Sequence, residues 1–149
     1  MSVDYIIKKL SEKDLSEDKD GFLKTLSNLT VVGEIDYKKM KNILLKIESQ
    51  DGYIYIAKKD KRIIGTATLL VEQKFIHGGG KVGHIEDVSV RKEYENNGVA
   101  SNLMKKLVEV AKEKGCYKVI LDCESELIPF YEKNNFYLYG NCMRINLQS

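Results

Sequence analysis

The stretch from Gly83 to Ala100, GHIEDVSVRKEYENNGVA, combines two adjacent carboxylates with a glycine-containing loop that leads into a helix. Carboxylates such as Glu86 and Asp87 can exchange protons with a ligand. The start of a helix presents unpaired backbone N–H groups and the positive end of the helix dipole, and both favour a bound phosphate. Gly98 allows a ligand to approach the backbone closely. The segment therefore predicts a phosphate site beside carboxylates, although many strand–loop–helix junctions bind nothing.

The position of Glu86 can be interpreted in two ways. Strand periodicity puts Glu86 and Asp87 on opposite faces of the predicted strand. The expected neighbours of Glu86 on its own face are Val82, His84, Val88 and Val90. A carboxylate in such a row is costly unless it is paired or functional. The alternative is an edge strand with a solvated face, and the residues alone favour it.

The hydrophobic pattern predicts a mixed α/β order of elements. Helices are expected to begin at Ser11, where Asp14 completes a capping box, and at Asp36. A long amphipathic helix follows Gly98 and stops at Gly115, and a short one covers 126–134. The expected strands are 4–9, 53–58, 63–75, 81–90 and 117–122, followed by a strand or hairpin over 136–147. The three strands between 53 and 90 suggest an antiparallel meander.

Composition excludes several classes of protein. The chain has 149 residues and a net charge of +2, which predicts one domain over 1–149 and no electrostatic footprint for nucleic acid. No apolar run approaches the roughly 18 residues of a membrane span, and the N-terminus lacks the apolar core of a signal peptide. The three cysteines, Cys116, Cys123 and Cys142, lack CxxC spacing, so a zinc site or a secreted disulfide framework is not expected. The cytoplasm is the expected location.

The segment EYENNGVASNLM resembles the pyrophosphate-binding loop of the GCN5-related N-acetyltransferases, whose pattern is Gln/Arg-x-x-Gly-x-Gly/Ala. Residues 95–100 match the last three positions, and Glu95 stands where the family has Gln or Arg. The predicted order of elements also resembles that fold, which implies a twisted, mostly antiparallel sheet, flanked by helices, that splays where the coenzyme enters.

Further segments make the resemblance more specific. LTVVG, GHIEDVSV, GCYKVILDCE and FYEKNNF together resemble the branch of the family that transfers acetyl from acetyl-CoA to the amine of glucosamine 6-phosphate, on the route to UDP-N-acetylglucosamine. This similarity spans nearly the whole chain with consistent spacing. It implies direct attack of the amine in a ternary complex, with no metal, and a homodimer whose substrate contacts cross the interface.

The resemblance assigns catalytic roles to three residues. Tyr131 is the implied general acid, which donates a proton to the departing CoA thiolate. Asp122, with the backbone of Leu121, orients the amine, and Glu86 or Asp87 helps to deprotonate it. From the residues alone, a core aromatic is the favoured interpretation of Tyr131, whereas a cap or turn residue is as well supported for Asp122 as a site residue. Cys116 and Cys123 are interpreted as small buried residues without the marks of an activated thiolate.

The resemblance also implies two sets of binding residues. The backbone of Val88, Ser89 and Val90 pairs with the pantetheine arm of acetyl-CoA like an added strand, and the alternative is ordinary sheet pairing. The remaining coenzyme contacts are Asn96, Asn97, Gly98, Val99, Ala100, Ser101, Asp122 and Tyr131. The implied contacts to the sugar phosphate are Thr30, Lys74, His77, Glu86, Asp87, Lys118 and Arg144.

One departure from the branch leaves the acceptor open. Asn146 stands where the branch has a phosphate-binding Arg, and an amide cannot make the bidentate phosphate contact of a guanidinium. Arg144 lies two residues earlier, on the same face of an extended strand, and is expected to compensate. The alternatives are an acetyltransferase for another small amine or a protein N-terminus, and a non-catalytic acyl-CoA-binding module, for which Glu95 is the only hint.

Overall fold

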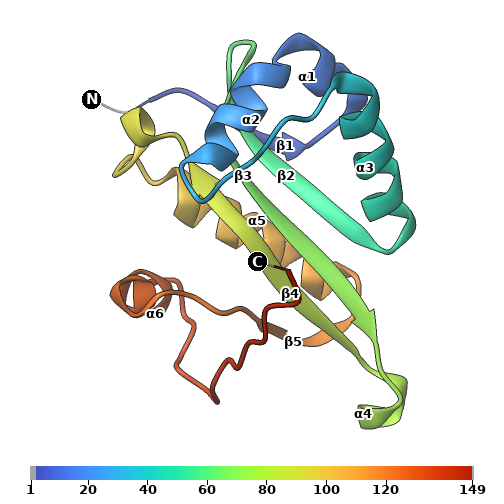
Figure 1. Cartoon of the computed structure of the whole chain (residues 1–149). Helices are drawn as coiled ribbons and strands as arrows, with labels where there is room; N and C mark the ends of the chain where they lie inside the picture. The colour runs from blue at the N-terminus through green and yellow to red at the C-terminus, as the bar shows by residue number, and fades with distance from the viewer. Residues whose placement is uncertain (1–2, 149) are drawn as a thin grey trace.

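A five-stranded sheet in the order β1-β2-β3-β4-β5 forms the centre of the computed structural model, which describes residues 3–148 (Figure 1). The strands are β1 (Ile6–Lys9), β2 (Gly52–Lys59), β3 (Arg62–Gln73), β4 (Lys81–Val90) and β5 (Cys116–Ile120). The first four pair antiparallel with their neighbours, and β5 pairs parallel to β4. The predicted mixed α/β fold with a mostly antiparallel sheet is confirmed.

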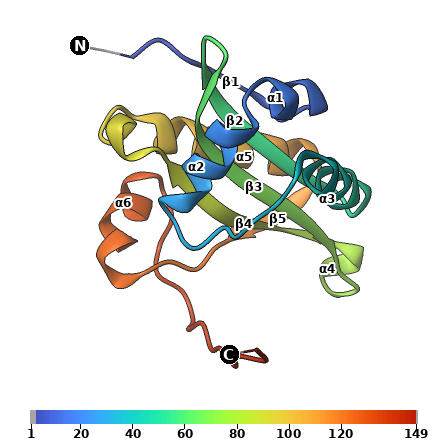
Figure 2. The same cartoon turned by 45° about the horizontal axis from the view of Figure 1, so that its top comes forward.

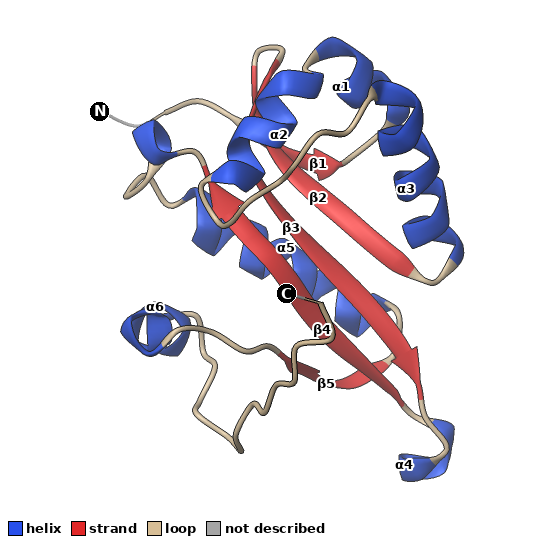
Figure 3. Cartoon of the chain, viewed as in Figure 1, coloured by secondary structure: helices blue, strands red, loops and turns tan. Residues whose placement is uncertain are grey.

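Helices cover the two faces of the sheet unequally. One face, over β1 to β3, carries α1 (Glu12–Glu17), α2 (Lys19–Ser27) and α3 (Tyr37–Ser49), and α5 (Val99–Glu113) packs on the opposite face (Figures 1 and 2). The short elements are α4 (Ile76–Gly79), η1 (Lys92–Tyr94), η2 (Ser125–Leu127) and α6 (Ile128–Lys133). Figure 3 shows α6 and the C-terminal segment lying beside β4 and β5 instead of on the helical layer above β1 to β3.

The core is divided by the sheet into two apolar clusters. On the α5 side, Val99, Leu103 and Leu107 are fully buried against Leu69 and Ile85. The other cluster joins β2 and β3 to the helices above them and contains Leu10, Leu15, Met40, Leu44, Ile54, Ile56 and Ile63. Burial of such side chains supplies roughly 1.5–3 kcal/mol each, so α5 is fixed firmly on the sheet.

Asp14 anchors α1 to the sheet. It is 1% exposed and completes the predicted capping box with Ser11. Its carboxylate also accepts hydrogen bonds from Lys58 Nζ at 2.6 Å and Lys8 Nζ at 2.5 Å. Burial alone would raise the pKa of Asp14, but these lysine and serine hydrogen bonds hold it well below its usual range.

Several predicted boundaries were wrong. Asp18 caps a new helix, so the first predicted helix is two helices, α1 and α2. The predicted strand or hairpin over 136–147 is absent from the described residues, where that segment has no regular structure. Alternation of apolar and polar residues favours a strand only where a partner strand completes the hydrogen bonds, and no neighbour in the chain does so here. Within residues 3–148, no helix has the length and hydropathy needed to span a membrane.

Candidate active site

A β-bulge in β4 lies at the centre of the candidate site. Thr68 pairs with Glu86 and Thr66 with Ser89, so one residue of β3 lies opposite two of β4. Asp87 takes the extra position, with a left-handed φ of 50°. The bulge puts Glu86 and Ser89 on the same face.

The predicted neighbours of Glu86 therefore need correction. Val88 and Val90 pack against the α5 cluster that contains Ile85, on the face opposite Glu86. Strict two-residue alternation fails after Glu86 because the bulge inserts one residue. His84, two residues before the bulge, stays on the face of Glu86 as predicted.

The sheet splits beside the bulge. Pairing of β4 with β5 ends at His84 and Ile120, whereas β4 continues to Val90 with β3 as its strand partner. Among the described strands, none lies along the other edge of Val88–Val90. The Ser89 side chain is already used, because its Oγ donates to the carbonyl of Thr25 at 2.6 Å. What remains at Val88, Ser89 and Val90 is a backbone edge without a strand partner, on which the Val90 carbonyl accepts a hydrogen bond from Asn28 Nδ2 at 2.6 Å. Such an edge suits a strand-like ligand.

The loop between β4 and α5 has the geometry of an anion cradle. Asn96 and Gly98 both have left-handed φ values, 64° and 77°. The Asn97 side-chain amide donates to the carbonyls of Tyr94 and Glu95, at 3.2 and 2.9 Å. Gly98 precedes α5 without a side-chain cap, so the first N–H groups of the helix have no side-chain acceptor. Alternating left-handed residues turn successive N–H groups toward one concavity, which suits a phosphate.

Asp122 lies close enough to Glu86 and to Tyr131 to influence the ionisation of both. Burial and the negative charges of Asp122 and Asp87 raise the pKa of Glu86. Burial, with Cys123 and Asp122 nearby, raises the pKa of Tyr131. Asp122 follows the end of β5 by two residues, and Tyr131 of α6 belongs to the apolar cluster against which Val88 and Val90 pack, beyond the point where β4 and β5 separate.

Tyr131 is positioned by aromatic contacts. It is 8% exposed, and its ring meets Phe130 and Phe136 edge-on, with centroids 4.9 and 6.1 Å away. The hydrogen bonds of residues 3–148 include none from its hydroxyl. Asn134 Nδ2 donates to Ser101 Oγ at 3.3 Å and joins α6 to the first turn of α5. The phenol is therefore held on a fixed element with its proton free for a ligand.

Two further residues near this cluster were given no role by the sequence. The prediction that Cys123 is buried was wrong, because its side chain is exposed beside Asp122, and Cys116 is only partly buried. Partial desolvation, with the charges of Asp122 and Glu124, raises the pKa of the Cys123 thiol. A thiol held protonated is a poor nucleophile, which argues against an acetyl-cysteine intermediate. His84 shares the face of Glu86, and its Nε2 lies 2.8 Å from Glu72 Oε1. In the sequence, the spacing of two residues between His84 and Glu86 was the signal that placed both on one face of the strand.

The predicted sugar-phosphate residues are not all brought together within one chain. Strand register puts Lys118 on the same face as Glu86, and Thr30 follows the end of α2. Lys74 and His77 lie at the tip of the β3–β4 hairpin, where the His77 ring stacks on Tyr117 with centroids 4.1 Å apart. Arg144 lies on the exposed C-terminal segment and donates from Nε to Asn146 Oδ1 at 2.7 Å.

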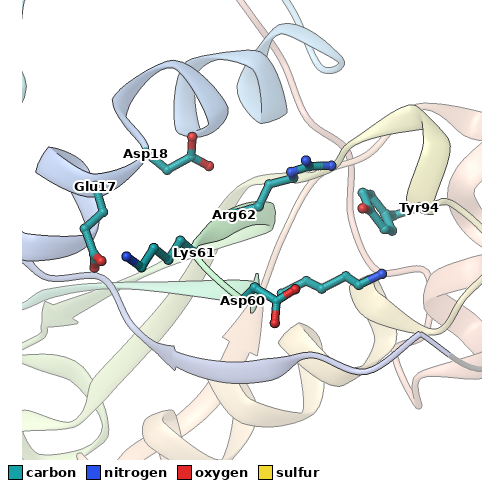
Figure 4. A pocket seen from close by; sticks show the side chains of 7 residues that line it. Glu17, Asp18, Asp60, Lys61, Arg62 and Tyr94 are labelled. Carbon is teal, nitrogen blue, oxygen red and sulfur yellow. The ribbon is translucent and has the colours of Figure 1, made fainter.

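One concavity of the surface lies away from these residues. A cavity of about 620 Å³ opens between α1, α2 and the β2–β3 turn and is lined by charges of both signs (Figure 4). None of the predicted site residues lines it. In the described part of the chain, no cluster of three or more His, Cys, Asp or Glu residues could hold a metal ion.

Three features of the site are typical of an acyl-CoA-dependent transferase. They are a bulged strand, an uncapped helix start that can cradle a diphosphate, and a split sheet beside a phenol and carboxylates. The sequence profile of the acetyltransferase (GNAT) family matches residues 22–136, and the chain belongs to that family. Glucosamine 6-phosphate N-acetyltransferase of Trypanosoma brucei brucei is 36% identical over 148 residues, covering 97% of each chain. The enzyme of that name from Candida albicans is 40% identical over 132 residues, covering 87% of each.

A solved structure agrees with these relatives. The crystal structure of glucosamine-6-phosphate N-acetyltransferase from Arabidopsis thaliana superposes with a TM-score of 0.91 at 31% identity. It covers 97% of this chain and 99% of its own. The predicted family, fold and enzyme class are confirmed.

The two ends of α5 provide a matched test of the diphosphate cradle. Gly98 and Gly115 both have left-handed φ values, 77° and 83°, and an added Cβ would meet no atom within 4 Å at either position. Gly98→Glu and Gly115→Glu therefore carry similar backbone strain of about 1 kcal/mol, but only the first puts bulk and negative charge into the cradle. We expect Gly98→Glu to weaken binding of acetyl-CoA at least about tenfold in calorimetric titrations.

The Gly115→Glu protein should bind the coenzyme like wild type, with a similar thermal unfolding midpoint in both variants. Equal affinities in the two variants would exclude the loop at 96–101 from the coenzyme site.

Proposed function

We propose that this protein transfers the acetyl group of acetyl-CoA to the amine of glucosamine 6-phosphate, giving N-acetylglucosamine 6-phosphate. The observation that carries this proposal is the similarity, over nearly the full length of the chain, to enzymes of that name. The product is a precursor for UDP-N-acetylglucosamine. We also propose that residues 1–149 act as one domain in the cytoplasm, where free cysteines such as these three are maintained.

Acetyl-CoA is proposed to enter the split between β4 and β5. Its pantetheine arm would pair with the backbone edge of Val88, Ser89 and Val90, where Asn28 also contacts the Val90 carbonyl. Its diphosphate would accept hydrogen bonds from the N–H groups of Asn97 to Ser101 at the start of α5. Asn96 contributes its left-handed backbone, and Val99 anchors the loop because its side chain is 1% exposed. This arrangement directs the thioester toward Asp122 and Tyr131 without a metal.

The amine must lose a proton before it attacks the thioester carbonyl. Glu86 is proposed to accept this proton, because burial and the neighbouring carboxylates raise its pKa, and Asp122 is proposed to orient the amine. The neutral amine then forms the C–N bond as the C–S bond breaks, and the extra proton on the new amide nitrogen passes to solvent, from which Tyr131 regains the proton that it gives to the thiolate. Asp87, exposed at the bulge, is proposed to contact the sugar.

Tyr131 is proposed to protonate the departing CoA thiolate. Burial and the nearby Cys123 and Asp122 raise its pKa, so the phenol keeps its proton at neutral pH. A thiol and a phenol have similar pKa values, which suits transfer between them.

The phosphate of the sugar needs positively charged side chains around it. Within one chain, the predicted phosphate-binding residues do not all lie beside Glu86. Met143, Ile145 and Leu147 alternate with Arg144 and Asn146 on an extended segment, and these three apolar side chains are 82–94% exposed. Figure 2 shows this segment running away from the rest of the fold. We propose that this segment packs on a second copy of the chain in a homodimer. A phosphate site would then be completed across the interface. Its proposed residues are Arg144, the hairpin-tip residues Lys74 and His77, Lys118 and Thr30.

The homodimer can be tested on the two faces of the C-terminal segment. Ile145→Glu places a charge in the apolar face, whereas Gln148→Glu places the same charge on the polar face. We expect light scattering to give the mass of a dimer for wild type and for Gln148→Glu, and the mass of a monomer for Ile145→Glu. A monomeric wild type would exclude the dimer.

The acceptor is tested by release of CoA thiol from acetyl-CoA. We expect release with glucosamine 6-phosphate at a kcat/KM at least about tenfold above that with plain glucosamine, because charge-assisted hydrogen bonds to the phosphate are lost without it. Turnover with another amine but not with this sugar would contradict the proposed acceptor. Coenzyme binding without turnover on any amine would favour the acyl-CoA-binding module.

Replacement of Tyr131 tests the proposed acid. Tyr131→Phe keeps the edge-on ring contacts and removes only the hydroxyl. We expect kcat to fall about 10²-fold while the affinity for acetyl-CoA stays within about twofold, because only the proton donor is lost. Phe130→Leu, a change in the adjacent ring, is the control for packing. A Tyr131→Phe protein with the turnover of wild type would show that Tyr131 is not the acid.

A further inference from the structure

Asn28 joins two segments that the proposed reaction uses. It lies at the C-terminal end of α2, two residues before Thr30, and its side chain is exposed. Asn28 Nδ2 donates to the carbonyl of Val90 at 2.6 Å and to Glu95 Oε1 at 2.9 Å. The amide therefore contacts both the end of β4 and the residue that begins the coenzyme loop, 67 positions away in sequence.

Glu95 has an unfavourable charge for its position. It immediately precedes the left-handed Asn96, and its carbonyl accepts the hydrogen bond from Asn97 that shapes the loop. A diphosphate on the N–H groups of 97–101 would be repelled by a free carboxylate at this point, and the repulsion would be strongest at low salt. In the structure the carboxylate is instead engaged by Asn28 on α2.

The end of α2 that carries Asn28 is itself held to the sheet by hydrogen bonds. Ser89 Oγ donates to the carbonyl of Thr25 in α2, and Thr25 Oγ1 donates to the carbonyl of Ile63 in β3 at 3.1 Å. Both residues are buried. The C-terminal end of α2 therefore cannot move freely relative to β4, and the Asn28 amide is presented to Glu95 at a constant place.

We propose that Asn28 is a positioning residue for the coenzyme loop, whose amide holds the Glu95 carboxylate against α2 and away from the diphosphate of acetyl-CoA. This role rests on the proposed use of acetyl-CoA. It also explains how a carboxylate can stand at the position where the family pattern has Gln or Arg.

The test is a double-mutant cycle on coenzyme binding. Calorimetric titration of acetyl-CoA, without sugar, is made on wild type, Asn28→Ala, Glu95→Gln and the double variant. We expect Asn28→Ala to bind about tenfold more weakly, because the released carboxylate repels the diphosphate. Glu95→Gln should bind at least as tightly as wild type, and the double variant should bind within about twofold of Glu95→Gln. Raising the salt concentration should reduce the defect of Asn28→Ala.

Ser27→Ala is the matched control, because Ser27 is exposed at the same end of α2 and its Oγ donates only to the carbonyl of Lys24. It should bind acetyl-CoA like wild type. A double variant as weak as Asn28→Ala, or an Asn28→Ala protein with wild-type affinity, would overturn the role of Asn28. A wild type that binds acetyl-CoA without acetylating the sugar contradicts only the proposed acceptor, whereas absence of coenzyme binding overturns both proposals.

Discussion

The backbone of β4 carries one more residue than β3 between two cross-strand pairs, because Asp87 adopts a left-handed conformation. Before this bulge, Glu86 points to the face of the sheet along which the C-terminal segment runs, next to β5. After it, Val88 and Val90 are turned into the α5 core, and the outer edge of the strand is left without a strand partner. The inserted residue therefore decides which side chains follow Glu86, because in an unbulged strand Val88 and Val90 would lie on the face of Glu86 instead of in the α5 core.

The bulge is useful only because α5 is held at a fixed distance from it. An added Cβ on Gly65 would lie 2.8 Å from Val99 Cγ1, so the first turn of α5 lies almost on the backbone of β3. Val99, Leu103 and Leu107 are nearly fully buried and keep it there. The uncapped N–H groups of α5 are thus presented beside the end of β4 by packing, without help from side-chain caps.

Periodicity in the sequence predicted the elements well where local chemistry decides them. The caps at Ser11 and Asp36 and the apolar face of α5 are all present, because each depends on residues three or four positions apart. The direction of Val88 and Val90 was not predictable, since the left-handed conformation of Asp87 leaves no pattern in the sequence. The C-terminal segment was predicted as a strand from its alternation alone, without a partner in the chain. The roles of Glu86, Asp122 and Tyr131 came from family resemblance and stay predictions.

The proposed reaction places a negatively charged diphosphate in the same cleft as the carboxylates that are proposed to serve as bases. The structure separates the two by the length of the free strand edge, with Glu86 and Asp122 at the point where the sheet splits and the cradle at the end of β4. Glu95 interrupts this separation, because it puts a carboxylate at the cradle itself. Its hydrogen bond to Asn28 restores the division of charge through a contact 67 residues away, which no local pattern in either segment indicates. In such a site, the residues that keep like charges apart matter as much as those that bind.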